Sequence, residues 1–312
     1  RILMKGFKNK NVNLIKSQNG ATLVVIIITM VALAVIGIAI YSLTYTASLN
    51  QVVAQRAAKA FYIAESCVRV AASEYKASAN KNATLVSLHN QTFPMPNNQG
   101  SCTVEIYPYW LYATTAYNAG VSPIIIYLPG ALPKVDENSD EPLVLRADGL
   151  LKIKKAGSTT NYSPAEFSAA SAGTFSAASG TPVTFTLSSP FTVAIVAGDL
   201  FYLGYKYTSS STAPNAGDDL VLNIPAGDTN NDTAKIFPSS KGSIFVEAGG
   251  AISQYSYNER IISSGTVTLT NIQAIAGAPT PVWPVTISNT APGTPIYMGK
   301  SIGFRSKSEY GD

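Results

Sequence analysis

Residues 21–43 read ATLVVIIITMVALAVIGIAIYSL, an apolar run that contains no charged residue. The uncharged stretch around it is longer and covers about 39 residues between Lys16 and Arg56. As a helix rising about 1.5 Å per residue, the apolar run is long enough to cross the ~30 Å hydrocarbon core of a bilayer. The sequence therefore predicts a membrane-embedded helix over residues 21–43.

The charges on either side of this run predict its orientation. The basic residues that precede it are Arg1, Lys5, Lys8, Lys10 and Lys16, and the first acidic residue of the chain is Glu65. Because basic flanks stay on the cytoplasmic side of a membrane, we expect the N-terminus inside the cell and everything after residue 43 outside.

A helical pattern continues beyond the apolar run. Apolar residues recur there at intervals of three and four, at Ala57, Ala60, Phe61, Ala64, Cys67, Val68, Ala71 and Tyr75. This spacing predicts an amphipathic stem over residues 44–78 that extends the membrane helix. A secretory signal peptide is the alternative, but its apolar core is usually about 7–15 residues long and ends at a cleavage site followed by unrelated sequence.

Two segments carry a family resemblance: QNGATLVV at residues 18–25 and RAAKAFYIAESCVR at residues 56–69. They resemble the type IV pilin superfamily, in particular the PilX-type minor pilins, over the first 76 residues or so. The resemblance implies that residues 1–20 are a leader and that a prepilin peptidase cuts between Gly20 and Ala21. It also implies a bacterial inner-membrane protein whose helix later packs with other pilin subunits in an extracellular filament.

Two positions of the apolar run bear on its assembly. Most major pilins carry Glu at the fifth mature position, where this chain has Val25. A buried unpaired charge costs several kcal/mol, so the apolar side chain removes a reason to dock below another subunit and suggests a minor subunit at the filament base or tip. Gly37 interrupts the helix and indicates either a close-packing point or a place where the helix stretches.

Other functions remain open at this stage. A type II secretion tip pseudopilin also lacks the acidic residue and has a similar size, although it usually carries an additional helical domain. A membrane-anchored adhesin or binding module would use the helix as a plain anchor, without peptidase or filament. Cleavage after Gly20 distinguishes the filament subunits from the anchor.

The rest of the chain predicts an α+β fold in which a β-rich head of antiparallel sheets, residues 79–312, follows the helix. Runs of Val, Ile, Thr, Tyr and Phe alternate with Gly, Pro and Asn clusters, which is typical of strands. The repeat FSAASAGT/FSAASGT at residues 167–181 indicates a loop or hairpin, and a possible subdomain seam at 156–181. The expected strands cover residues 102–107, 123–128, 143–153, 182–187, 192–196, 200–207, 220–224, 243–247, 266–272 and 284–287.

The two cysteines of the chain are Cys67, on the apolar face of the stem, and Cys102, at the start of the first main strand. Exported proteins favour disulfides, so we expect a bond that ties the stem to the head. Two buried free thiols are the alternative. A catalytic thiol is disfavoured because His89 is the single histidine available as its base.

Charge and motifs argue against nucleic-acid binding and catalysis. The formal charge is +4, but residues 1–20 carry five of the 22 basic groups, which leaves 17 against 18 acidic residues in the remainder. No nucleophile elbow, dinucleotide fingerprint or zinc-protease motif occurs, and GTPIYMGKS at residues 293–301 lacks the spacing of a phosphate loop. We therefore expect a protein that is not an enzyme, has no cofactor and does not bind nucleic acid.

Two surfaces remain as candidate binding sites. Asp228, Asn230 and Asp232 alternate oxygen ligands as calcium loops do, as do Asp136, Asn138 and Asp140, but Asx-rich turns explain both equally well. An aromatic cluster indicates either a stacking face for a glycan or partner surface or, as we favour, tyrosines of a β core. Its members are Tyr107, Tyr109, Trp110, Tyr112 and Tyr117.

Overall fold

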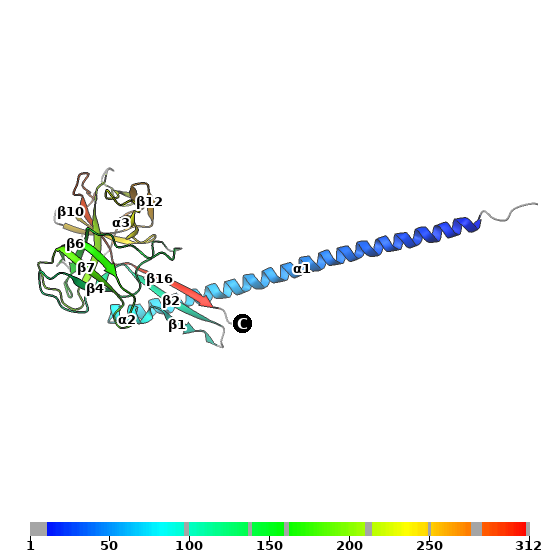
Figure 1. Ribbon diagram of the computed structural model, residues 1–312, viewed down its shortest axis with the longest axis horizontal. Coiled ribbons are helices and arrows are strands. Elements are labelled where there is room, and N and C mark those ends of the chain that lie inside the picture. Colours follow the sequence, from blue (N-terminus) through cyan, green and yellow to red (C-terminus); the bar gives the residue numbers. More distant parts are fainter. Residues whose placement is uncertain are drawn as a thin grey trace, which may run out of the picture. The chain divides into compact units, whose positions relative to one another are not determined.

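The computed structural model describes residues 11–96, 100–136, 139–158, 162–209, 214–248, 251–275 and 283–309. The chain divides into two compact units, Arg1–Tyr62 and Ile63–Asp312. Helix α1 (Asn11–Ala77) contributes residues to both, and each unit is described by itself (Figure 1).

In the first unit α1 is an uninterrupted helix. Residues 11–62 contain no proline. Threonine hydroxyls, which could otherwise compete for backbone hydrogen bonds, donate to the carbonyl oxygen one turn earlier. Thr29 Oγ1 donates to Val25 O (2.7 Å), and Thr44 Oγ1 donates to Ile40 O (2.8 Å). The predicted helix is confirmed, but it begins at Asn11, about ten residues before the apolar run that set its expected start.

The second unit contains a three-stranded antiparallel sheet that receives the end of α1. Strands β1 (Gln91–Pro94), β2 (Ser101–Pro108) and β16 (Ile302–Glu309) form it in that order, and β16 lies beside β2 in Figure 1. Alternate residues of β2 are buried, as expected for a strand with one covered face. They form an apolar cluster with α1 and with α2 (Lys81–Leu88). The buried members include Cys67, Ala71, Leu85, Leu88, Cys102, Val104, Ile106 and Trp110.

Six further strands close into a barrel. In ring order they are β5 (Gly149–Lys154), β6 (Tyr162–Ala172), β7 (Thr181–Ser189), β4 (Ile124–Leu128), β3 (Leu111–Tyr112) and β8 (Leu200–Tyr207). Antiparallel pairing of β8 with β5 completes the ring. Closure removes the free strand edges that an open sheet would expose.

Beyond the barrel, β8 also pairs with β15 (Thr294–Met298), which continues the sheet outward. The extension runs through β10 (Ser243–Ala248), β11 (Ala251–Ser256) and β14 (Gln273–Ala274). A separate three-stranded sheet consists of β12 (Arg260–Ser263), β13 (Thr266–Leu269) and β9 (Leu220–Asn223), and α3 (Asp232–Lys235) lies between β9 and β10 in the chain.

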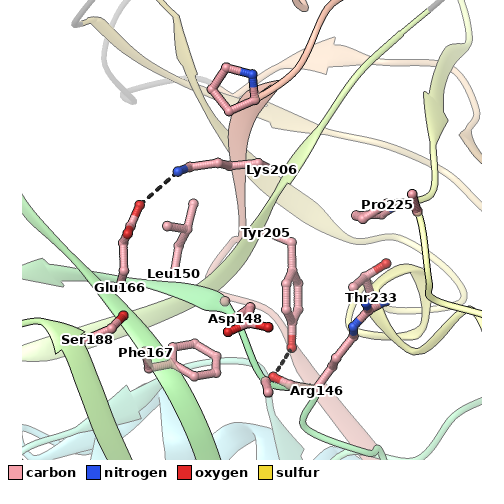
Figure 2. Close-up of a pocket in the computed structure, with 14 residues that line it drawn as sticks. Arg146, Asp148, Leu150, Glu166, Phe167, Ser188, Tyr205, Lys206, Pro225 and Thr233 are labelled. Atoms are coloured by element: carbon pink, nitrogen blue, oxygen red, sulfur yellow. Dashed lines mark hydrogen bonds and ion pairs between the residues drawn. The ribbon is translucent and has the colours of Figure 1, made fainter.

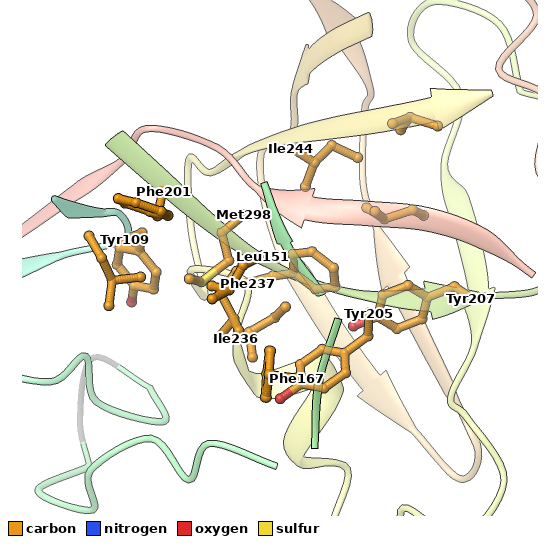
Figure 3. Close-up of a cluster of buried hydrophobic side chains, with 14 of the residues drawn as sticks. Tyr109, Leu151, Phe167, Phe201, Tyr205, Tyr207, Ile236, Phe237, Ile244 and Met298 are labelled. Atoms are coloured by element: carbon orange, nitrogen blue, oxygen red, sulfur yellow. The ribbon is translucent and has the colours of Figure 1, made fainter. Parts of the chain in front are cut away.

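The main core fills the barrel and the space beside it with large aromatic side chains (Figure 3). Phe167 contacts Phe185 and Tyr205 edge to face, an arrangement that adds to the burial of apolar area. The buried tyrosine hydroxyls have partners: Tyr205 Oη donates to Arg146 O (3.0 Å) and Tyr207 Oη to Thr233 O (2.7 Å). The α+β prediction is therefore confirmed, with a barrel that the sequence did not predict.

Most expected strands are present, but four are wrong in whole or part. The strand expected at 266–272 ends at Leu269 as β13. Residues 143–148 are irregular and β5 starts at Gly149. Residues 192–196 form a loop in which Ile195 makes one isolated bridge to Tyr117, and residues 284–287 form no strand. These runs are apolar because single side chains such as Ile195 and Val285 reach the core from loops.

The expected seam at 156–181 falls inside the barrel. Its repeat begins on β6 and ends at β7, so the hairpin interpretation is correct. Phe167 within the repeat is fully buried, and this hairpin belongs to the compact unit Ile63–Asp312.

Candidate functional site

The most exposed apolar surface of the chain lies on α1. Among the described residues, Leu23–Ala77 is the one helix long and apolar enough to cross a membrane. Within the apolar run every large hydrophobic side chain from Leu23 to Leu43 is about half to three-quarters exposed, from 48% at Ile26 to 72% at Leu43. Such a surface requires a nonaqueous neighbour.

Exposure of apolar side chains continues beyond the length that a bilayer covers. After residue 43 the exposed large hydrophobic residues of the first unit are Tyr45, Leu49, Val52, Val53, Phe61 and Tyr62. They extend over roughly 26 Å of helix, since each residue adds about 1.5 Å. A bilayer-spanning anchor alone gives no reason for these exposed hydrophobic side chains, which share residues 45–62 with charged ones such as Arg56 and Lys59.

The residues predicted to act in processing and assembly lie on this helix. Gly20 and Ala21 fall within the backbone of α1, and residues 1–10 lie outside the described residues. Val25 is 61% exposed, and a Cβ added at Gly37 would meet nothing within 4 Å. Both positions are thus open to a partner, while cleavage after Gly20 stays a prediction.

The last turns of α1 are fixed to the sheet by two bonds. Cys67 and Cys102 form a disulfide that links α1 to β2, as predicted, and both residues are 1% exposed. Ser306 Oγ on β16 donates to Ala64 O (2.9 Å), which ties the helix to a second strand of the same sheet.

No family model, curated protein or solved structure matches this chain. The likeness to pilins is therefore architectural: a long apolar N-terminal helix whose final turns, residues 63–77, pack against an antiparallel β-rich head.

The candidate calcium ligands lie in a hydrogen-bonded turn. Both carboxylate oxygens of Asp228 accept hydrogen bonds, from Asp232 N (2.9 Å), Thr233 N (2.8 Å) and Thr233 Oγ1 (2.6 Å). Burial alone would raise the pKa of Asp228, but these bonds and Arg146 at 3.6 Å hold it below its ordinary value. Asp232 contacts Lys235, and no group of three His, Cys, Asp or Glu side chains in the described part of the chain is arranged around a metal. Of the two interpretations of Asp228, Asn230 and Asp232, the polar turn describes the geometry.

The second acidic run is also used within the fold. Asp140 pairs with Arg305 of β16 at 2.6 Å, whereas Asn138 lies outside the described residues. The aromatic cluster behaves as core: Tyr107, Tyr109 and Trp110 are buried. The partly buried Tyr112 donates its hydroxyl to Ser179 O (3.0 Å), so the cluster offers little ring surface for stacking.

A cavity of about 430 Å³ opens at one end of the barrel beside β5 and β8 (Figure 2). Its charged side chains are largely matched within the wall, since Lys206 pairs with Glu166 at 2.8 Å and Arg146 faces Asp228. Arg146 Nη1 is buried and makes no hydrogen bond within the described structure. The near balance of charge favours a structural role for these groups.

A second, basic cavity was not predicted from the sequence. It is a wide depression open to solvent, with a volume of about 760 Å³, and Lys81, Lys154, Lys155 and Lys300 line it. The adjacent Lys154 and Lys155 are the one feature of the sequence that could have indicated this site, because the other two lysines are far away in the chain. We call it the lysine cavity.

Proposed function

We propose that the chain is a minor subunit of a type IV pilus-like filament, made as an inner-membrane precursor and assembled after cleavage between Gly20 and Ala21. The observation that carries this proposal is the set of six exposed hydrophobic side chains within residues 45–62. Fully burying a Val or Phe side chain is worth about 1.5–3 kcal/mol, so a helix that leaves several of them in water is costly unless another surface covers them.

Neighbouring copies of similar helices supply such a cover. Side chains three and four residues apart, such as Tyr45, Leu49, Val52 and Val53, form a continuous ridge that fits the groove of a packed helix. The same helix then serves first in the bilayer and later in the filament. Val25, which brings no carboxylate into that packing, supports a position at the base or tip.

Cleavage is the first test. The full chain is co-expressed with a prepilin peptidase, and the N-terminus of the membrane-bound product is determined by mass spectrometry. We expect Ala21 as the first residue, and a Gly20→Val variant that is not cleaved. Gly37→Val is the matched control, because it makes the same change within the apolar run and should be processed normally.

Assembly is the second test. In cells that make pili, we expect the cleaved protein in sheared filaments, detected by immunogold labelling. A Val53→Ser/Phe61→Ser variant should enter the membrane and be cleaved but be reduced at least fivefold in the filament fraction. Lys59→Ser, on the same stretch of helix, is the control. An uncleaved protein that stays in the membrane would instead identify a membrane-anchored adhesin or binding module, and co-fractionation with a type II secretion apparatus would identify a tip pseudopilin.

A further inference from the structure

The lysine cavity gathers basic side chains from segments that are distant in sequence. Lys81 begins α2, Lys154 ends β5, Lys155 follows it, and Lys300 lies between β15 and β16. None of the described residues that line the cavity is acidic. Like charges repel one another, and the charges of Lys154 and Lys81 act in this way on Lys300.

Lys81 and Lys155 are fixed by hydrogen bonds to other described residues. Lys81 Nζ donates to Tyr75 O (2.7 Å) and Lys76 O (2.8 Å) at the end of α1. Lys155 Nζ donates to Ala194 O (2.7 Å) and pairs with the buried Asp199 at 2.5 Å. Their positions are therefore set before any ligand binds. They contribute to the electrostatic potential of the lysine cavity more than they contribute hydrogen bonds to a ligand.

Lys300 is different, because its ammonium makes no hydrogen bond or ion pair with the described residues. It lies 5.1 Å from the centre of the Trp110 ring, and the indole of Trp110 in turn donates to Asn82 Oδ1 (3.1 Å) on α2. Burial lowers the pKa of Lys300, and the charges of Lys154 and Lys81 lower it further. The ammonium is thus held beside an aromatic face with its donors available.

We propose that the lysine cavity binds a phosphate group carried on a larger molecule. An ammonium group binds phosphate as a point charge. A phosphate offers several charged acceptor oxygens to donors on different sides, whereas a carboxylate offers two oxygens and one charge. A volume of about 760 Å³ has room for much more than one phosphate. The inference is independent of the filament function, since every group in it belongs to the unit Ile63–Asp312.

The test uses the full chain in nonionic detergent, titrated with sodium tripolyphosphate in a calorimeter. We expect saturable binding to the wild type that weakens as sodium chloride is raised from 50 to 300 mM, because salt screens the attraction. A Lys154→Gln/Lys300→Met variant should bind at least tenfold more weakly. Lys241→Gln removes an exposed lysine outside the cavity and should stay within twofold of the wild type.

Two checks separate loss of binding from loss of fold. Lys300→Arg keeps the charge and should bind within about threefold of the wild type. The disulfide and the circular dichroism spectrum of the double variant should be unchanged. Absence of saturable heat with the wild type, or an equal loss in Lys241→Gln, would overturn the proposal. So would equally tight binding of citrate, which has the same kind of multiple charge on carboxylates.

The source of the phosphate is distinguished by competition. Micelles doped with phosphatidylglycerol are compared with micelles doped with phosphatidylcholine, each in the presence of tripolyphosphate. Competition by phosphatidylglycerol alone identifies a lipid headgroup as the ligand. Competition by neither lipid excludes these headgroups and assigns the site to a soluble phosphate-bearing molecule, the class that tripolyphosphate represents.

Discussion

Cys67 on α1 and Cys102 on β2 are joined by a disulfide inside the apolar cluster that the helix and the three-stranded sheet share. The bond closes a loop with a sequence separation of 35 residues that contains α2 and β1. It therefore holds the helix to the sheet even when the surrounding packing loosens.

Removing this disulfide should destabilise the protein strongly. In the chain-entropy model, a loop of this length contributes about 4 kcal/mol, so we expect the Cys67→Ala/Cys102→Ala variant to lose about that much free energy of unfolding. Urea unfolding of the detergent-solubilised chain measures the loss. Reducing agent should shift the midpoint of the wild type and leave the variant unchanged. A loss below about 1 kcal/mol would show that packing alone holds the helix.

The buried ion pair between Lys152 and Glu247 predicts unequal effects of its two single variants. Lys152 Nζ lies 2.7 Å from Glu247 Oε2, and the lysine side chain is 4% exposed against 23% for the glutamate. Glu247→Leu leaves a buried ammonium behind and should cost about 3–5 kcal/mol. Lys152→Met leaves a carboxylate that reaches water, and it should cost less.

The double variant of this pair completes the cycle. Because two apolar side chains leave no unpaired charge, Lys152→Met/Glu247→Leu should recover much of the stability lost in Glu247→Leu. Urea unfolding of all four proteins gives the coupling energy. Losses that simply add would rule out an interaction between the two side chains.

His89 predicts a loss of stability in mild acid. Its buried Nδ1 accepts a hydrogen bond from Ile106 N (2.9 Å), which a proton on that nitrogen would remove. Burial lowers the pKa of His89, although the charge of Glu105 acts in the opposite direction. In the unfolded state the pKa of His89 is about 6.5, so below that pH the unfolded state binds more protons than the folded state. The free energy of unfolding therefore falls as the pH decreases from about 6.5.

The slope of this loss is at most about 1.4 kcal/mol per pH unit, between the pKa values of the unfolded and folded states. Unfolding midpoints at pH 7.5 and 5.5 measure it. His89→Gln, whose amide oxygen can accept the same bond but does not titrate, should show a smaller change between the two pH values. An identical pH dependence in both proteins would exclude His89 as the cause.

Gly149 at the start of β5 should not accept a larger side chain. An added Cβ would collide with the ring of Phe167 and lie 2.9 Å from Tyr205 Cε1 in the barrel core. We expect Gly149→Ala to cost about 1–3 kcal/mol in free energy of unfolding, because overpacking forces buried rings to move. Gly303→Ala on β16 is the control: its nearest neighbour is Tyr107 Cβ at 3.6 Å, and its stability should change by less than about 0.5 kcal/mol.

The helix and the disulfide were predictable because their signals are local or few. The length and periodicity of an uninterrupted apolar run predict a helix directly. Two cysteines allow only one pairing. β6 was missed because its Ser- and Ala-rich segment has little strand propensity. It pairs along β5 and β7, so the barrel around Phe167 decides its conformation.

The sites were less predictable than the helix. Asp228 matched a ligand pattern in sequence, but its partners Thr233 and Arg146 become visible only when the chain is folded. The lysine cavity depends on Lys81 and Lys300, which are more than 200 residues apart and meet through strand pairing. Which distant strands pair with one another is the feature that is hardest to predict from a single sequence.

The pairing of β16 with β2 sets an order of events during synthesis. Register runs from Ile302 against Pro108 to Glu309 against Ser101, so β2 lacks one neighbour until some 200 further residues have been made. The growing chain therefore has one open edge on β2 during this time, and an unintended strand can add to that edge. The three-stranded sheet is therefore completed only when β16 has been made, long after the helix that packs on it.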